Sequence, residues 1–185
     1  QIIRSILMVT ATTFMFYSLQ KFDLVDIYVV FFTAPLIVSL LSAYFLKDIL
    51  STKGILLMLL SFGSIVYSLG PSMRIFSLDL IFPIVPPICW ALYQFFTKVV
   101  SGDNDPFAAI FYTSILGAII FSIFIFFNWV PLEKNIFWLY LVILGVAGFV
   151  SHSLIIYAIQ LSNLSFVTNF QYSQLVWSTI INFLI

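Results

Sequence analysis

Residues 151–178 read SHSLIIYAIQLSNLSFVTNFQYSQLVWS, two apolar runs joined by a short polar hinge. Uncharged polar side chains in the second run make the stretch too polar to be only a membrane anchor. Residues 11–38, ATTFMFYSLQKFDLVDIYVVFFTAPLIV, align with it at an offset of 140 positions. The matched positions include Tyr17 with Tyr157, Gln20 with Gln160, and Leu24 with Leu164. We therefore predict that the chain contains one helix pair twice.

The composition indicates an integral membrane protein. Hydrophobic residues make up 63% of the chain and charged residues 8%, against about 45–50% and about 25% in average soluble domains. The net charge is zero and lysine and arginine do not cluster, which argues against a nucleic-acid site. The single cysteine, Cys89, offers neither a disulfide nor a cysteine metal site. We expect it to pack as a small apolar residue.

Charged residues divide the chain into membrane spans, because a charge at the bilayer centre costs at least about 2.5 kcal/mol. A helix needs roughly 20 apolar residues to cross the hydrocarbon core. The last uncharged stretch is too long for one helix, and its natural break is the hinge at residues 160–165, where Ser and Asn favour a turn. The seven predicted spans are residues 5–20, 27–46, 54–69, 80–97, 106–128, 136–159 and 166–185.

The number of spans between the two copies predicts their relative orientation. Five span lengths separate Tyr17 from Tyr157, and because five is odd, the second copy crosses the membrane upside down. This is the inverted-repeat plan of many secondary transporters. The loop cations favour one topology weakly, with four on the face that would be cytoplasmic and three on the other. The first group is Arg4, Lys47, Lys53 and Lys98, and the second is Lys21, Arg74 and Lys134.

Four of the predicted spans carry a polar stripe, because positions three, four and seven apart share a helix face. Such a stripe cannot readily face lipid, so it faces another helix or a cavity. For serine and threonine we favour helix-to-helix contact, and for the glutamines both interpretations stay open. The stripes are Thr10, Thr13, Tyr17 and Gln20; Pro83, Pro86, Pro87, Trp90, Tyr93, Gln94 and Thr97; Gly145, Gly148 and His152; and Gln171, Gln174, Ser178 and Asn182.

Prolines and the single histidine add two further expectations. Pro83, Pro86 and Pro87 remove backbone donors within one span, which predicts a kink or a broken helix there, and Pro35 does the same in the second span. His152 is the only side chain within a span that could titrate near neutral pH. Without a carboxylate partner, we favour a packing or solute-contact role for it over proton transfer.

Three stretches together resemble the EamA family of the drug/metabolite transporter superfamily. They are RSILMVTATTFMFYSLQKFDLVDIYVVFFTAPLIVSLLSAYFL, ICWALYQFFTK and GVAGFVSHSLIIYAIQLSNLSFVTNFQYSQLVWS. The resemblance implies an all-α membrane protein of ten helices in two inverted five-helix repeats, with alternating access to small organic solutes. It assigns residues 1–71 to the last three helices of the first repeat and 78–185 to the second repeat without its last helix. We accordingly expect the chain, which opens on Gln1, to be a fragment covering helices three to nine.

The predicted function is transport of a small metabolite or drug-like solute through a central cavity, in the bacterial inner membrane. Aromatic side chains would stack on the solute and amides would bind its polar edge. Two alternatives are a seven-helix receptor-type protein and a membrane scaffold subunit without a cavity. The residues expected to line the cavity are Trp90, Tyr93, Gln94, His152, Gln171, Tyr172, Gln174, Tyr17, Thr13 and Pro35.

The expected partners are the lipid bilayer and a small-molecule substrate, with a homodimer allowed and nucleic acid not expected. Catalytic motifs such as HExxH, GxSxG and a glycine-rich phosphate loop are missing from the sequence. We therefore predict no enzymatic activity, no cofactor and no metal.

Overall fold

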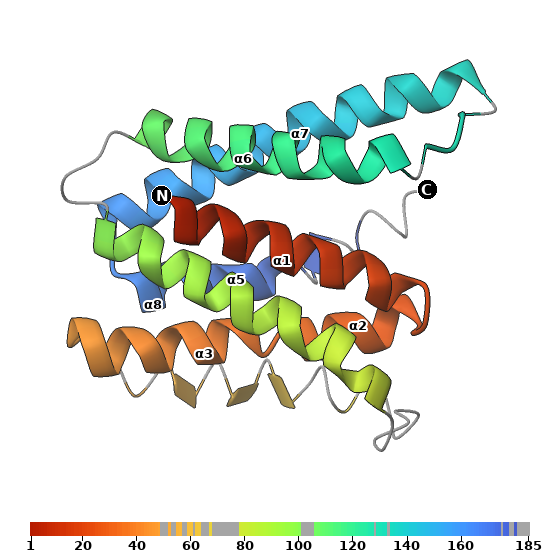
Figure 1. Ribbon diagram of the computed structural model, residues 1–185. Coiled ribbons are helices and arrows are strands. Elements are labelled where there is room, and N and C mark those ends of the chain that lie inside the picture. The colour runs from red at the N-terminus through yellow and green to blue at the C-terminus, as the bar shows by residue number, and fades with distance from the viewer. Residues whose placement is uncertain are drawn as a thin grey trace.

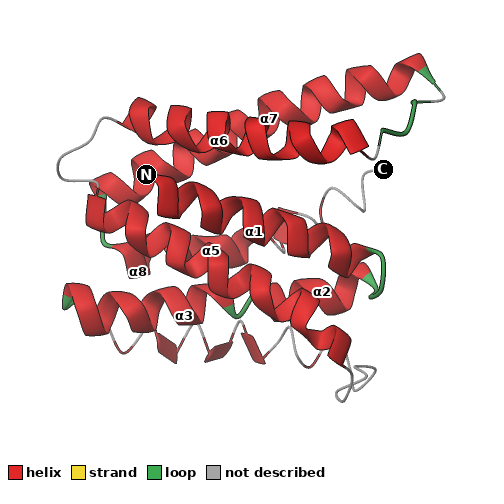
Figure 2. Cartoon of the chain, viewed as in Figure 1, coloured by secondary structure: helices red, strands yellow, loops and turns green. Residues whose placement is uncertain are grey.

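The computed structural model describes residues 1–48, 78–100, 106–127, 129–132 and 134–174, with scattered residues between 52 and 67 and between 176 and 180. All regular structure in these residues is helical (Figure 2). The helices run roughly along one axis, with α1 and α5 between the α6–α7 layer and the α2–α3 layer (Figure 1). The first half of the chain contributes α1 (Ile2–Leu19), α2 (Leu24–Phe31), α3 (Ala34–Leu41) and a π-helical turn (Ser42–Leu46). The second half contributes a 3-10 turn (Leu78–Leu80), α5 (Ile81–Val100), α6 (Pro106–Phe127), α7 (Asn135–Leu161), α8 (Leu164–Asn169) and a second 3-10 turn (Phe170–Tyr172).

Four described segments are long and apolar enough to cross a membrane. They are Ile2–Leu19, Asp26–Leu46, Pro106–Phe127 and Asn135–Leu161. Most of the predicted span at 54–69 and most of the end of that at 166–185 lie outside the residues that the structure describes. The integral membrane class is thus supported, whereas the seven-span count stays a prediction.

Helix α5 is the centre of the bundle, because it packs against α1, α2, α3, α7 and α8. It runs unbroken although Pro86 and Pro87 lie inside it, so the expected break of this span does not occur. Pro83 falls in the first turn, where a backbone N–H would have no intrahelical acceptor in any case. All three prolines are buried against neighbouring helices, so the proline-rich turn serves as a packing surface.

The second predicted span does break at its proline. Helix α2 ends at Phe31 and α3 starts at Ala34, because Pro35 has no N–H to donate to the Phe31 carbonyl. The backbone N–H and side-chain hydroxyl of Thr33 instead bond to the Val30 carbonyl, at 3.0 and 2.7 Å. The backbone therefore forms one tighter turn, with a hydrogen bond to the residue three positions back, and α3 continues in the direction of α2.

The turn between α7 and α8 falls inside the predicted hinge, at Ser162 and Asn163. A buried cluster joins this corner to the rest of the bundle. Its members come from α3, α5, α7 and α8, namely Val38, Ala91, Ile159, Leu164 and Val167. Helices α1 and α7 run in opposite directions along the bundle axis (Figure 1). The start of α1, the end of α5 and the α7–α8 turn consequently lie at one end of the bundle.

Candidate functional site

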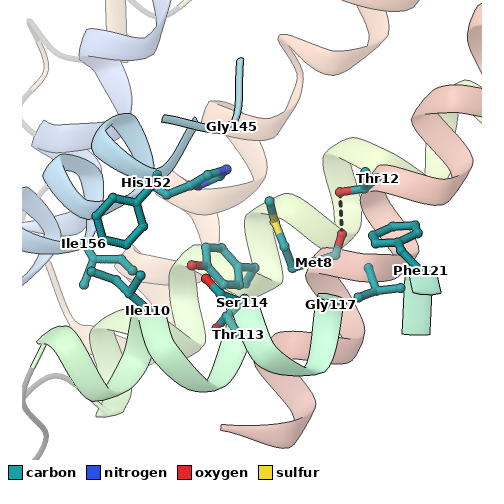
Figure 3. Close-up of a pocket in the computed structure, with 13 residues that line it drawn as sticks. Met8, Thr12, Ile110, Thr113, Ser114, Gly117, Phe121, Gly145, His152 and Ile156 are labelled. Atoms are coloured by element: carbon teal, nitrogen blue, oxygen red, sulfur yellow. Dashed lines mark hydrogen bonds between the residues drawn. The ribbon is translucent and has the colours of Figure 1, made fainter. Parts of the chain in front are cut away.

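A cavity of about 250 Å³ lies between α1, α5, α6 and α7. Figure 3 shows His152 on the α7 wall, with Thr113 and Ser114 of α6 opposite it and Met8 and Thr12 of α1 at one side. Two of its lining residues, Gly117 and Gly145, have no side chain and so leave space for a bound molecule. Because four helices contribute side chains to its wall, we take this cavity as the candidate solute site.

Aromatic rings form one corner of this site. The Trp90 and Tyr93 rings are stacked, with centroids 5.4 Å apart and planes at 19°. The His152 ring meets Trp90 edge-on at 5.6 Å. Tyr93 and His152 line the cavity directly, and Trp90 contacts both rings without lining the cavity. Two predicted residues of α5 and one of α7 are thus brought together.

Positions 90, 94 and 98 form a stripe along α5, since residues four apart share a helix face. Trp90 contacts His152, and Gln94 accepts a hydrogen bond of 2.8 Å from Nε2 of Gln171. Gln94 is fully buried, and its own Nε2 has no partner among the described residues. The pair therefore bridges two helices, as the helix-contact interpretation predicts, and still leaves one buried donor unused.

The predicted residue Tyr172 contacts the other half of the chain. Its hydroxyl donates to the Phe32 carbonyl at 3.1 Å, and the two rings are stacked with centroids 5.9 Å apart. The carbonyl lies in the α2–α3 break, outside the regular helical ladder. Tyr172 thus satisfies a backbone acceptor at the interruption, which is what membrane proteins require of broken helices.

The other predicted lining residues lie away from the cavity described. Tyr17 is exposed and packs on the Phe82 ring, at 5.9 Å between centroids. Thr13 is half-buried, Pro35 is buried at the start of α3, and Gln174 is exposed. None of these four residues lines the cavity described.

Arg4 is a buried residue that the sequence reasoning treated only as a loop cation. Its side chain is 2% exposed, and Nε donates to Oγ1 of Thr97 at 3.0 Å. The guanidinium carbon lies 5.1 Å from the centre of the Tyr93 ring, a cation–π contact. Nη1 donates to Oε1 of Gln1. The burial could be found only by placing α1 antiparallel to α5, which no local pattern indicates.

Lys98 caps the end of α7 from the neighbouring helix. Its Nζ donates to the carbonyls of Ile159 and Ser162 at 2.8 and 2.7 Å, groups that a helix C-terminus leaves without intrahelical donors. Only Ile156 and Ile159 are buried in α7, so the helix is anchored near this end. Lys98 therefore holds the turn between α7 and α8 in place, and with it the segment that carries Gln171.

Replacement of Lys98 by methionine is expected to lower the unfolding free energy by about 1–3 kcal/mol, because two partly buried carbonyls lose their donor. The melting temperature of the purified protein in detergent measures this. Lys98→Arg keeps a cationic donor and should recover most of the loss. Lys134→Met removes an exposed lysine before α7 and is the control. Equal melting temperatures for Lys98→Met and Lys134→Met would contradict the capping role.

Two threonine hydroxyls that line the cavity bond within their own helices rather than to a neighbouring helix. Thr12 donates to the Met8 carbonyl at 2.9 Å and Thr113 to the Ala109 carbonyl at 2.8 Å. No group of three or more His, Cys, Asp or Glu side chains that could hold a metal occurs in the described part of the chain. The site is suited to binding by shape, aromatic contact and uncharged polar groups.

Comparison with known families identifies one match. A profile of the EamA-like transporter family matches residues 78–185, more than half of the chain. The matched range includes α5 to α8, and with them Trp90, Tyr93 and His152. Neither the search of curated proteins nor that of solved structures gave a significant match.

Proposed function

Because the chain belongs to the EamA-like transporter family, we propose that it carries a small organic solute across the membrane by alternating access. In this proposal the seven predicted spans belong to a ten-helix bundle of two inverted five-helix repeats in a bacterial inner membrane. The main structural support for this proposal is a contact between two helix interruptions, one in each half of the chain.

The local geometry supports the repeat. Asp23 and Asn163, 140 positions apart, precede α2 and α8 with nearly the same extended backbone, φ −65° and ψ 142° against φ −65° and ψ 135°. The helices that follow start at Leu24 and Leu164, again 140 positions apart. Helices α1 and α7 run in opposite directions, which supports the proposal that the second helix pair is the inverted counterpart of the first.

The interruptions occur at nearly matching positions, within two residues of the 140-residue offset. Helix α2 stops at Phe31 before the α2–α3 break, and α8 stops at Asn169 before a 3-10 turn that ends at Tyr172. The contact between Phe32 and Tyr172 joins positions that the 140-residue offset pairs. Contact between equivalent residues is expected where a two-fold axis relates the repeats, and discontinuous helices at such an axis form the sites of many transporters.

In the proposed mechanism the solute contacts Tyr93 and His152 in the cavity, and Trp90 supports both rings. The bond between Gln94 and Gln171 links α5 to the second repeat's broken helix and would change as the helices rearrange. Thr13, Tyr17, Pro35, Tyr172 and Gln174 remain proposed site residues for another state of the carrier. A scaffold subunit would be expected to have no cavity, so the described cavity favours transport over that alternative.

A reconstitution experiment tests the proposal. Full-length protein is screened against a metabolite panel for a rise in melting temperature, since a ligand of the native state stabilises it. Any hit is then radiolabelled and offered to proteoliposomes, where saturable uptake and counterflow are expected. Trp90→Ala should reduce the initial rate at least tenfold while the protein stays folded. Uptake identical to that of protein-free liposomes, or unaffected by Trp90→Ala, would refute the transport proposal or its site.

A further inference from the structure

The charges around the candidate cavity restrict what it can bind. None of its described lining residues is Asp, Glu, Lys or Arg. Arg4 is a buried cation against the Tyr93 ring, does not line the cavity, and directs two of its nitrogens to Thr97 and Gln1, while its Nη2 has no partner among the described residues. A charged solute would enter this site without a counter-charge, which is costly away from water. The cavity therefore favours an uncharged solute.

The hydroxyls of the cavity restrict the solute's hydrogen bonding. Thr12 and Thr113 each donate their only hydroxyl hydrogen to a carbonyl of their own helix. A threonine hydroxyl has one hydrogen and two lone pairs, so both oxygens can only accept a bond from a bound molecule. They lie on α1 and α6, on different sides of the cavity (Figure 3). At these two oxygens the bound molecule must therefore be the donor.

The shape of the wall indicates a flat molecule. Tyr93, Phe121, Phe149 and His152 contribute aromatic rings to the lining, and aromatic rings bind other rings by offset or edge contacts. Within the described residues neither nitrogen of His152 has a hydrogen-bond partner. Since a cavity of 150 Å³ holds benzene, about 250 Å³ has room for a two-ring molecule.

We propose that the solute of this cavity is an uncharged, flat heteroaromatic compound that donates N–H hydrogen bonds to the oxygens of Thr12 and Thr113. This deepens the proposed function and rests on it, because it assigns the solute class of the same site. The N–H is required because Thr12 and Thr113 already donate their hydroxyl hydrogens to carbonyls of their own helices. A charged solute is disfavoured because none of the described lining residues is charged.

Competition binding tests the inference without requiring transport. Tritiated indole is bound to purified full-length protein, and unlabelled indole, 1-methylindole, indole-3-carboxylate and tryptamine compete with it. 1-Methylindole has lost the N–H and should compete about three- to tenfold more weakly, the value of one neutral hydrogen bond. The anionic and cationic analogues should compete at least tenfold more weakly than indole. Equal competition by 1-methylindole, or by either charged analogue, would overturn the proposal.

Isosteric variants locate the acceptors. In Thr12→Val combined with Thr113→Val, the preference for indole over 1-methylindole should fall towards one. Thr10→Val removes a hydroxyl from α1 outside the cavity lining and should keep the full preference. A preference that survives the double substitution would show that the donor is recognised elsewhere. No specific indole binding, together with uptake of a different solute in proteoliposomes, would overturn this inference and leave the transport proposal standing.

Discussion

Gly145→Leu is expected to abolish solute uptake while leaving the protein folded. Gly145 lines the candidate cavity, and a Cβ added there meets no atom within 4 Å. The leucine side chain would project into space that a solute needs, and leucine is a better helix former than glycine. Initial uptake rates in proteoliposomes should fall at least a hundredfold, with a melting temperature equal to or above that of the parent protein.

The same helix provides a matched control. Gly148 also has no atom within 4 Å of an added Cβ, but it does not line the cavity. Gly148→Leu adds the same side chain to the same helix and should change uptake less than threefold. If both variants lost uptake equally, the effect would belong to the surface of α7 and not to the cavity. Normal uptake by Gly145→Leu would remove this cavity from the transport path.

Gln171→Leu is expected to destabilise the protein strongly for a single polar substitution. The change leaves the amide of Gln94, which is fully buried, without its partner at Oε1. A buried polar group left unsatisfied costs about 1–3 kcal/mol, which should appear as a fall of several degrees in the melting temperature.

The double variant Gln94→Leu with Gln171→Leu separates stability from function. Replacing both partners by apolar side chains removes the unsatisfied group, so most of the lost stability should return. If the amide pair serves transport, uptake should stay at least tenfold below that of the parent protein. Restoration of both stability and uptake would show that the glutamines only hold the helices together. That result would decide between the two interpretations that the sequence leaves open for these residues.

Much of the fold can be predicted from the sequence, because charges and apolar runs define helix ends in a membrane protein. The first span, predicted at 5–20, is α1 at Ile2–Leu19, and the predicted hinge contains the α7–α8 turn. The proline rule succeeded at Pro35 and failed for the break in α5. Pro83 occupies a first turn that has spare donors in any case, whereas Pro35 takes a donor from the middle of a span. Pro86 and Pro87 also lie inside a helix, yet α5 continues through them, and both are buried in the bundle.

The site is less predictable, because it depends on which faces of distant helices meet. Helical periodicity places Trp90, Tyr93 and Gln94 on one face of α5, and the structure brings His152 and Gln171 to them. Periodicity also aligns Gly145 with Gly148, although only Gly145 reaches the cavity. The roles of Lys98 and Arg4 depend on partners 61 and 93 positions away, a separation at which a pattern within one helix carries no information.

Arg4 has a consequence for the order in which the protein is assembled. During synthesis α1 leaves the ribosome long before α5, which carries both Thr97 and the Tyr93 ring. Until α5 arrives, the guanidinium can only extend towards the lipid headgroups and water. Arrival of α5 allows it to turn inward and become buried. The first half of the chain therefore completes its packing only after part of the second half has been inserted, so the halves mature together rather than one after the other.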